Sequence, residues 1–149
     1  MNELASNLNW PTTRDKVFAA EFYMKKLPQV EIPVKNYFSD GLYAREITIP
    51  AGVVLVGEIH KFKQLNILSF GEMSVLTENG IKRVKAPFTV VSPPGTKRIA
   101  YTHTECVWTT IHATDETDVD AIKSKFIAKD EQDWLEFCKT EELQLEFKL

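Results

Sequence analysis

Long apolar segments are missing from this 149-residue sequence. No stretch approaches the roughly 20 consecutive apolar residues that an α-helix needs to cross a bilayer. The first residues, Met1-Asn2-Glu3-Leu4, lack the basic start and the apolar run of a secretory signal peptide. We therefore expect a cytoplasmic protein that does not have a membrane as a partner.

Cysteine is scarce, because only Cys106 and Cys138 occur. Neither belongs to a Cys-x-x-Cys pair or to a Cys/His spacing of the kind that holds structural zinc. One disulfide between the two is an alternative, but two buried free thiols are the expected state in a cytosolic chain.

Charge of one sign is not in strong excess, since the formal net charge is −3. Residues 115–149 carry 11 acidic and 5 basic side chains, whereas residues 1–114 carry 10 acidic and 13 basic ones. A protein that binds a nucleic-acid polymer over a broad surface needs a more basic face than this. The lysines and arginines of the central segment suffice to attract a small anion, although most of them suit solvated strand faces.

Length and composition indicate one ordinary globular domain, with 44% apolar and 26% charged residues. We divide it into an N-terminal extension with a helix (1–40), a β core (41–114) and a helical C-terminal extension with a terminal strand (115–149). In the first part, Thr12 and Asp15 form a predicted capping box, and Pro28 stops the helix that follows.

The β core is predicted from alternating apolar residues and turn signals. Val30, Ile32 and Val34 alternate like a half-buried strand, and Asp40-Gly41 marks a turn. Asn-Gly favours a tight hairpin turn, so the sequence Asn79-Gly80 predicts that Val75 faces Val84. The remaining strands are expected over Leu42–Ile49, Val53–Phe62, Leu65–Phe70, Pro87–Ser92 and Arg98–His112. About eight short strands with frequent turns indicate a mainly β fold, an antiparallel sandwich or jelly roll.

The C-terminal part changes to helical patterns. A capping box at Thr117 predicts one helix, and a second helix is expected over Asp130–Lys139. The last residues alternate between apolar and polar from Leu143 to Leu149. This alternation predicts a terminal strand that needs a partner in its own sheet or in a second subunit.

Two motifs of the β core resemble those of the cupin superfamily, Gly57-Glu58-Ile59-His60 and Ser92-Pro93-Pro94-Gly95-Thr96-Lys97-Arg98. The resemblance runs from the strand of Tyr43 to His112, and it implies a jelly-roll barrel with helices at both ends. The chain also looks like small cupin-like proteins encoded by tailed bacteriophages, which would place it in a host cytoplasm. The residues that carry this second resemblance are Asp40–Arg45, Ile49–Gly52, Leu65–Ser69, Pro94–Arg98 and Val107–Thr114. It implies no particular activity.

The metal ligands that the cupin motifs imply are mostly absent. His60 matches the first ligand, but Phe62 stands at the second, Asn66 near the expected Glu and Arg98 at the last histidine. Phenylalanine cannot ligate a metal, and a protonated guanidinium repels a cation. We therefore expect neither a metal nor another cofactor. The less favoured alternative is a different metal site, rebuilt by His112 or His103 together with His60 and Glu58.

A pocket is predicted where two strands present polar and aromatic side chains on one face each. If both faces point into the barrel, they form a site with an apolar lining and a few convergent polar groups. The candidate ligand-binding residues are Glu58, His60, Phe62, Arg98, Tyr101, Trp108, Thr110 and His112. No residue is assigned a catalytic role.

Three functions remain open from the sequence. The favoured one is a metal-free binding protein for a small anion, such as a nucleotide or sugar derivative, with a host signalling nucleotide as one target. The second is an isomerase or epimerase with His60 or His112 as general base and Tyr101 as acid. The third is an assembly protein with a vestigial pocket. A homo-oligomer is expected because the amphipathic N-terminal helix and the terminal strand need partners.

Overall fold

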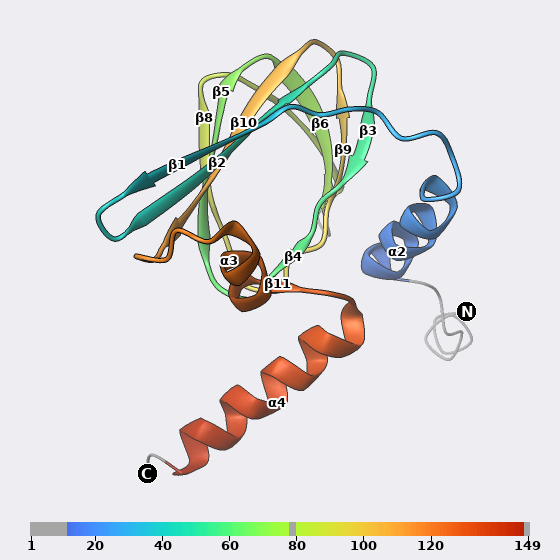
Figure 1. Cartoon of the computed structure of the whole chain (residues 1–149). Coiled ribbons are helices and arrows are strands. Elements are labelled where there is room, and N and C mark those ends of the chain that lie inside the picture. The colour runs from blue at the N-terminus through green and yellow to red at the C-terminus, as the bar shows by residue number, and fades with distance from the viewer. Residues whose placement is uncertain (1–11, 78–79, 148–149) are drawn as a thin grey trace, which may run out of the picture.

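The computed structural model describes residues 12–77 and 80–147. Two antiparallel sheets face each other and form a barrel (Figure 1). The larger sheet has the order β1 (Val34–Ser39), β2 (Leu42–Ile49), β10 (Cys106–Ala113), β5 (Gln64–Phe70) and β8 (Phe88–Ser92). The smaller one has the order β3 (Val54–Val56), β9 (Ile99–Thr102), β6 (Glu72–Thr77) and β7 (Gly80–Lys85). This arrangement confirms the predicted mainly β, antiparallel jelly-roll fold.

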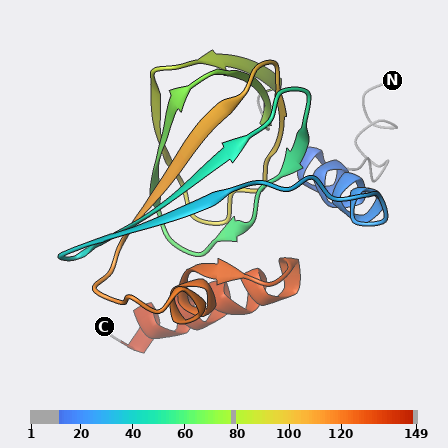
Figure 2. The same ribbon diagram turned by 45° about the horizontal axis from the view of Figure 1, so that its top comes forward.

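Helices flank the barrel at both ends of the chain (Figures 1 and 2). Helix α2 (Thr13–Met24) lies outside the smaller sheet, and α3 (Val119–Phe126) lies across one end of the barrel. The short strand β11 (Ile127–Ala128) follows α3 and pairs with β4 (Ile59–His60). Helix α4 (Glu131–Phe147) closes the described chain. Among these helices, none has the length and apolarity that spanning a membrane requires.

The best-predicted elements are those with an unambiguous local signal. The hydroxyl of Thr12 accepts a hydrogen bond from the backbone N–H of Asp15, and the Asp15 carboxylate accepts one from the N–H of Thr12. This is the predicted capping box, but the helix ends at Met24, before the stop predicted at Pro28. Strand β2 has the predicted bounds, and the turn before it contains Gly41 at φ +74°. Glycine adopts this left-handed conformation without the steric cost of a Cβ atom.

The hairpin of β6 and β7 has a different register from the predicted one. Met73 pairs with Val84, and Val75 pairs with Lys82, so the prediction that Val75 faces Val84 was wrong. The error is two residues, and a shift of two keeps each side chain on its face of the sheet. The hydrophobic pattern therefore could not detect it. Asn79, on which the turn prediction rested, lies outside the described residues.

Two predicted strands were too long. Residues 28–33 are not a strand, because β1 begins only at Val34, directly after Pro33. Proline has no N–H to donate to a neighbouring strand, which explains the late start. The predicted strand Val53–Phe62 is divided into β3 and β4, with Gly57 and Glu58 between them.

The C-terminal segment differs most from its prediction. The cap of α3 is Asp118 rather than Thr117, since the Asp118 carboxylate accepts a hydrogen bond from the N–H of Asp120. Helix α4 continues to Phe147, so the terminal strand predicted from Leu143 onward was wrong over residues 143–147. The last two residues of that prediction, 148 and 149, lie outside the described part of the chain. No proline or glycine interrupts this segment, and a helix that has already formed extends through it at little cost.

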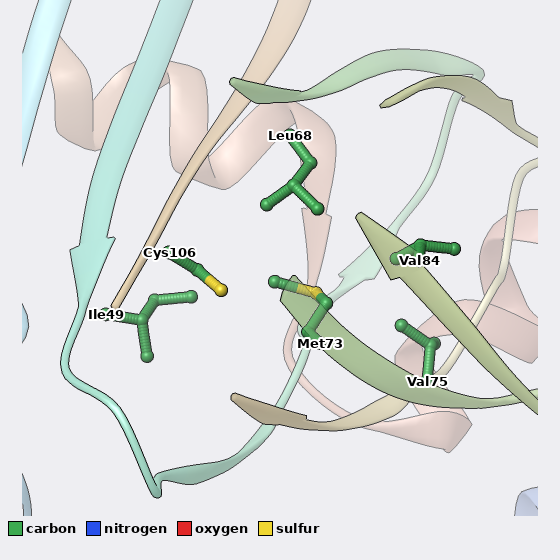
Figure 3. Close-up of a cluster of buried hydrophobic side chains, with 6 residues drawn as sticks. All are labelled: Ile49, Leu68, Met73, Val75, Val84 and Cys106. Carbon is green, nitrogen blue, oxygen red and sulfur yellow. The ribbon is translucent and has the colours of Figure 1, made fainter. Parts of the chain in front are cut away.

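Two hydrophobic clusters hold the barrel together. The first lies between the sheets and consists of Ile49, Leu68, Met73, Val75, Val84 and Cys106 (Figure 3). The second joins Tyr43 of β2 to Ile122 and Phe126 of α3, so that this helix seals its end of the barrel. Cys106 is a buried free thiol, as predicted, whereas Cys138 is free but only half-buried.

Candidate functional site

A cavity of about 310 Å³ lies inside the barrel. Both sheets contribute to its wall, together with the segment that joins β3 to β4 and the residues just before β9. Its volume is at the lower end of the range for small-molecule pockets, which is about 300–1,000 Å³. The cavity therefore suits a small ligand or one part of a larger one.

Five of the eight predicted site residues line this cavity: Glu58, His60, Arg98, Trp108 and Thr110. They come from the β3–β4 segment, β4, the residue before β9, and β10. Strand alternation brings Trp108 and Thr110 to the same inner face of β10, as predicted. Their role in binding stays a prediction.

The other three predicted residues lie elsewhere. Phe62 follows β4 and packs against Phe126 and Phe137, with ring centroids 5.5 and 5.4 Å apart, because the strand ends at His60. Tyr101 is 42% exposed and faces out of the barrel. Its neighbour Ala100 takes the inner position on β9 and lines the cavity.

His112 is buried behind the cavity wall and does not line the cavity. Its ring stacks on that of His60, with centroids 5.1 Å apart and planes 22° apart. The centroid of the Phe126 ring, from α3, lies 4.7 Å from the centroid of the His112 ring. His112 thus supports His60 and is not in a position to contact a ligand in the cavity.

Both imidazoles are neutral at physiological pH. Burial is the largest cause that lowers the pKa of His60, and together with the nearby His112, Arg45 and Arg98 it brings this pKa to about 3. Burial also lowers the pKa of His112. The Nδ1 atoms of both rings are buried, and neither has a hydrogen-bond partner among the described residues.

A chain of hydrogen bonds fixes the polar side of the cavity. The Arg98 guanidinium donates to the hydroxyl of Ser92, and the Asn66 amide donates to the same oxygen at 2.8 Å. The hydroxyl of Thr110 donates to the Asn66 carbonyl oxygen at 2.8 Å. Asn66, Ser92 and Thr110 are buried, so these contacts hold Arg98 in one orientation.

The sequence prediction missed Arg45 and Gln64, which also line the cavity. Arg45 is on β2, and its alternation with Tyr43 and Ile47 was a usable signal for the inner face. Gln64 is buried at the start of β5, and its Oε1 atom has no hydrogen-bond partner in the part of the chain that the structure describes. A buried carbonyl oxygen without a partner is costly.

The cavity has an excess of positive charge. Glu58 is the only acidic residue of its lining within the described chain, and the Lys123 ammonium lies 3.5 Å from the Glu58 carboxylate. Arg45 and Arg98 form no ion pair with any of the described residues. Burial lowers the pKa of Arg98, because desolvation disfavours its charged form. A bound anion would compensate for this desolvation.

The residues at the cupin ligand positions do not fit a metal ion. Of the expected metal donors, His60 is the one that is present in the described lining of the cavity. Phe62 packs against Phe126 of α3, and Arg98 brings a positive charge to the cavity. Within residues 12–77 and 80–147, no three His, Cys, Asp or Glu side chains are grouped closely enough to hold a metal ion. The chemistry of this donor set disfavours a cation.

Neither the protein-family models nor the curated proteins give a significant match to the chain. Solved structures do align with it. A cupin superfamily protein from Desulfitobacterium hafniense is 11% identical over 60% of this chain and 83% of its own, with a TM-score of 0.48. A cupin with a double-stranded β-helix fold from Methanocaldococcus jannaschii is 16% identical over 57% of this chain and 82% of its own, with a TM-score of 0.48. The DMSP lyase DddQ from Ruegeria pomeroyi is 21% identical over 58% of this chain and 49% of its own, with a TM-score of 0.49.

The structural neighbours thus include proteins described as cupins. At this level of identity and TM-score, none of them transfers an activity, and the jelly-roll assignment rests on the sheet order of the chain itself.

Proposed function

We propose that this protein is a metal-free binding protein for a small anionic ligand, such as a nucleotide or a sugar derivative. The observation that carries the proposal is the half-buried guanidinium of Arg98, which faces the cavity and contacts the Ser92 hydroxyl but no carboxylate of the described residues. Arg45 adds a second positive charge to the same cavity. A guanidinium binds phosphate and carboxylate groups through a fork of parallel hydrogen bonds.

The rest of the lining supports a ligand that carries more than a charge. The Trp108 ring offers an apolar surface for a base or a sugar. Gln64 and His60 also line the cavity, and Gln64 Oε1 and His60 Nδ1 are buried polar atoms without a hydrogen-bond partner among the described residues. No metal is needed for this recognition.

The test is calorimetry with inorganic phosphate, nucleoside monophosphates and sugar phosphates. We expect at least one of these probes to bind, and Arg98→Gln to weaken its binding at least tenfold, because the substitution removes the charged donor fork. Arg83→Gln is the matched control, since Arg83 is exposed on β7 and pairs with Glu72 outside the cavity. If no probe binds, or if Arg98→Gln binds as well as the unaltered protein, the proposal is wrong.

The two alternative functions have less support. An epimerase with Tyr101 as acid needs that residue beside the base, but Tyr101 faces away from the cavity. His60 has a pKa of about 3, far below the value near working pH that suits a general base. The assembly function relied partly on a terminal strand, and residues 143–147 are helical.

A phage origin, a cytoplasmic location and the sequestration of a host signalling nucleotide extend this proposal. They rest on the resemblance to phage-encoded cupin-like proteins and on no feature of the cavity. We propose them together with a homo-oligomeric state.

A further inference from the structure

A second hollow, the seam groove, lies on the other side of the cavity wall. It has a volume of about 910 Å³ and follows the edge strands β7 and β8, which belong to different sheets and do not pair with each other. Its lining is largely apolar and includes Ile81, Val84, Phe88, Val90, Pro93 and Trp134. An apolar groove of this kind binds apolar or aromatic groups.

The seam groove and the inner cavity share part of their walls. Val75, Thr96, Arg98 and Trp108 line both of them. Arg98, on which the proposed function depends, thus lines both the inner cavity and the seam groove. One ligand that contacts Arg98 can therefore extend from one space into the other.

The charges of the seam groove match those of the inner cavity. Lys82, Lys97 and Arg14 line it, whereas no acidic side chain of the described residues does. Lys97 and Arg14 are paired with Glu21 and Glu131, at 2.7 and 2.5 Å. Lys82 forms no ion pair with any residue of the described chain, and its ammonium lies 5.3 Å from the centre of the Phe88 ring. Of the described cations that line the seam groove, Lys82 is therefore one whose charge no carboxylate of the described residues compensates.

We propose that the ligand is an anion joined to a planar apolar group, and that the two hollows bind its two parts. The anionic group contacts Arg98 and Arg45 in the inner cavity, and the planar group lies in the seam groove between Trp108 and Trp134. This inference rests on the proposed function, because it takes the anion at Arg98 as given. It adds that the small inner cavity holds only part of the ligand.

Aromatic lining supports a planar group over a flexible aliphatic chain. Tryptophan rings offer large flat surfaces and favour offset stacking with other rings. Trp134 is held in place because its ring lies against Gly95, where an added Cβ atom would come within 2.2 Å of it. A fixed ring costs little entropy when a ligand stacks on it.

The test compares two phosphate monoesters with the same charged group, methyl phosphate and 1-naphthyl phosphate, by calorimetry. We expect 1-naphthyl phosphate to bind at least tenfold more tightly. In the double variant Ile81→Asn/Val91→Asn, this advantage falls at least fivefold, while the Kd of methyl phosphate changes less than twofold. Both side chains line the seam groove and are exposed, at 76% and 59%, so the fold tolerates the change.

Val54→Asn/Leu135→Asn is the matched control, because these side chains are 47% and 52% exposed and line neither hollow. It should keep the full advantage of 1-naphthyl phosphate. If both esters bind the unaltered protein equally well, and Arg98→Gln abolishes the binding of both, this inference is wrong and the proposed function stands. The inference is also wrong if the groove variant keeps the advantage. Absence of binding by both esters overturns this inference together with anion binding at Arg98.

Discussion

The stacked imidazoles of His60 and His112 are the most unusual residues of the site. Each has a buried Nδ1 atom that no described residue contacts through a hydrogen bond, and burial lowers the pKa of each ring. The pKa of His60 is about 3 in the folded protein, against an ordinary value of 6.5. Between these two pH values the unfolded chain binds a proton at this residue that the folded chain does not.

This difference predicts a loss of stability in acid. Because the unfolded state binds more protons between pH 6.5 and pH 3, the free energy of unfolding rises with pH in this window. His60 alone accounts for a slope of up to about 1.4 kcal/mol per pH unit. We expect His60→Gln to flatten the dependence between about pH 6 and pH 4, measured by urea denaturation.

His112→Gln should flatten the same profile, since burial lowers the pKa of His112 as well. Both variants are compared with the unaltered protein at about pH 7, where the histidines are largely neutral in either state. Parallel profiles for all three proteins would contradict the assigned pKa shifts.

At the scale of elements, the packing between strands depends on a glycine at one turn. Gly71 lies between β5 and β6 at φ +94°. A Cβ atom at this position would come within 2.0 Å of the Glu105 carbonyl oxygen and 2.8 Å of Cys106 Sγ. The turn therefore packs directly against the backbone before β10.

We expect Gly71→Ala to destabilise the fold by about 3 kcal/mol or more, because conformational strain and a backbone clash add. Gly52→Ala is the control, since Gly52 has φ +76° but nothing within 4 Å of an added Cβ. Gly52→Ala should lower the free energy of unfolding by only about 1 kcal/mol, because it adds backbone strain without a clash. Urea denaturation measures both, and equal losses would show that the close contact is absent.

The elements with complete local signals could be predicted from the sequence. Thr12 and Asp15 define the start of α2, and the alternation of β2 defines its bounds. The register of β6 and β7 could not be predicted, because a shift by two residues leaves the inner face unchanged. The alternation from Leu143 onward was misleading, since the preceding helix continues through it.

The residues of the candidate site could likewise be predicted only in part. Trp108 and Thr110 could be placed in the cavity because one strand orients both. Tyr101 was misplaced because the inner face of β9 depends on its pairing with β6, which local patterns do not reveal. Gln64 was missed because burial of a polar residue depends on the surrounding fold and not on its neighbours in sequence.

At the scale of the whole molecule, strand β1 is an open edge of the larger sheet as far as the described residues show. It pairs on one side with β2 and ends the order of its sheet. All six of its residues are exposed, among them Tyr37 and Phe38, and the hairpin with β2 projects beyond the barrel (Figures 1 and 2). An edge strand with exposed aromatic residues is a template for pairing with another strand.

We expect this edge to pair with β1 of a second copy in an antiparallel manner, which gives a two-fold symmetric dimer. Light scattering should give twice the chain mass of 17.0 kDa. Phe38→Lys should shift the protein to monomer, because a charge at the edge disfavours strand pairing. Phe22→Lys is the control, as Phe22 is exposed on α2 and away from the edge. A monomeric unaltered protein would refute this expectation.

Trp108 and Trp134, which line the walls described above, also give the protein a natural optical signal. Indole emission responds to the polarity around the ring and to quenching by nearby groups. Occupancy of the barrel should therefore change the emission spectrum of the unlabelled chain, and a library of metabolites can be screened by titration in a plate reader.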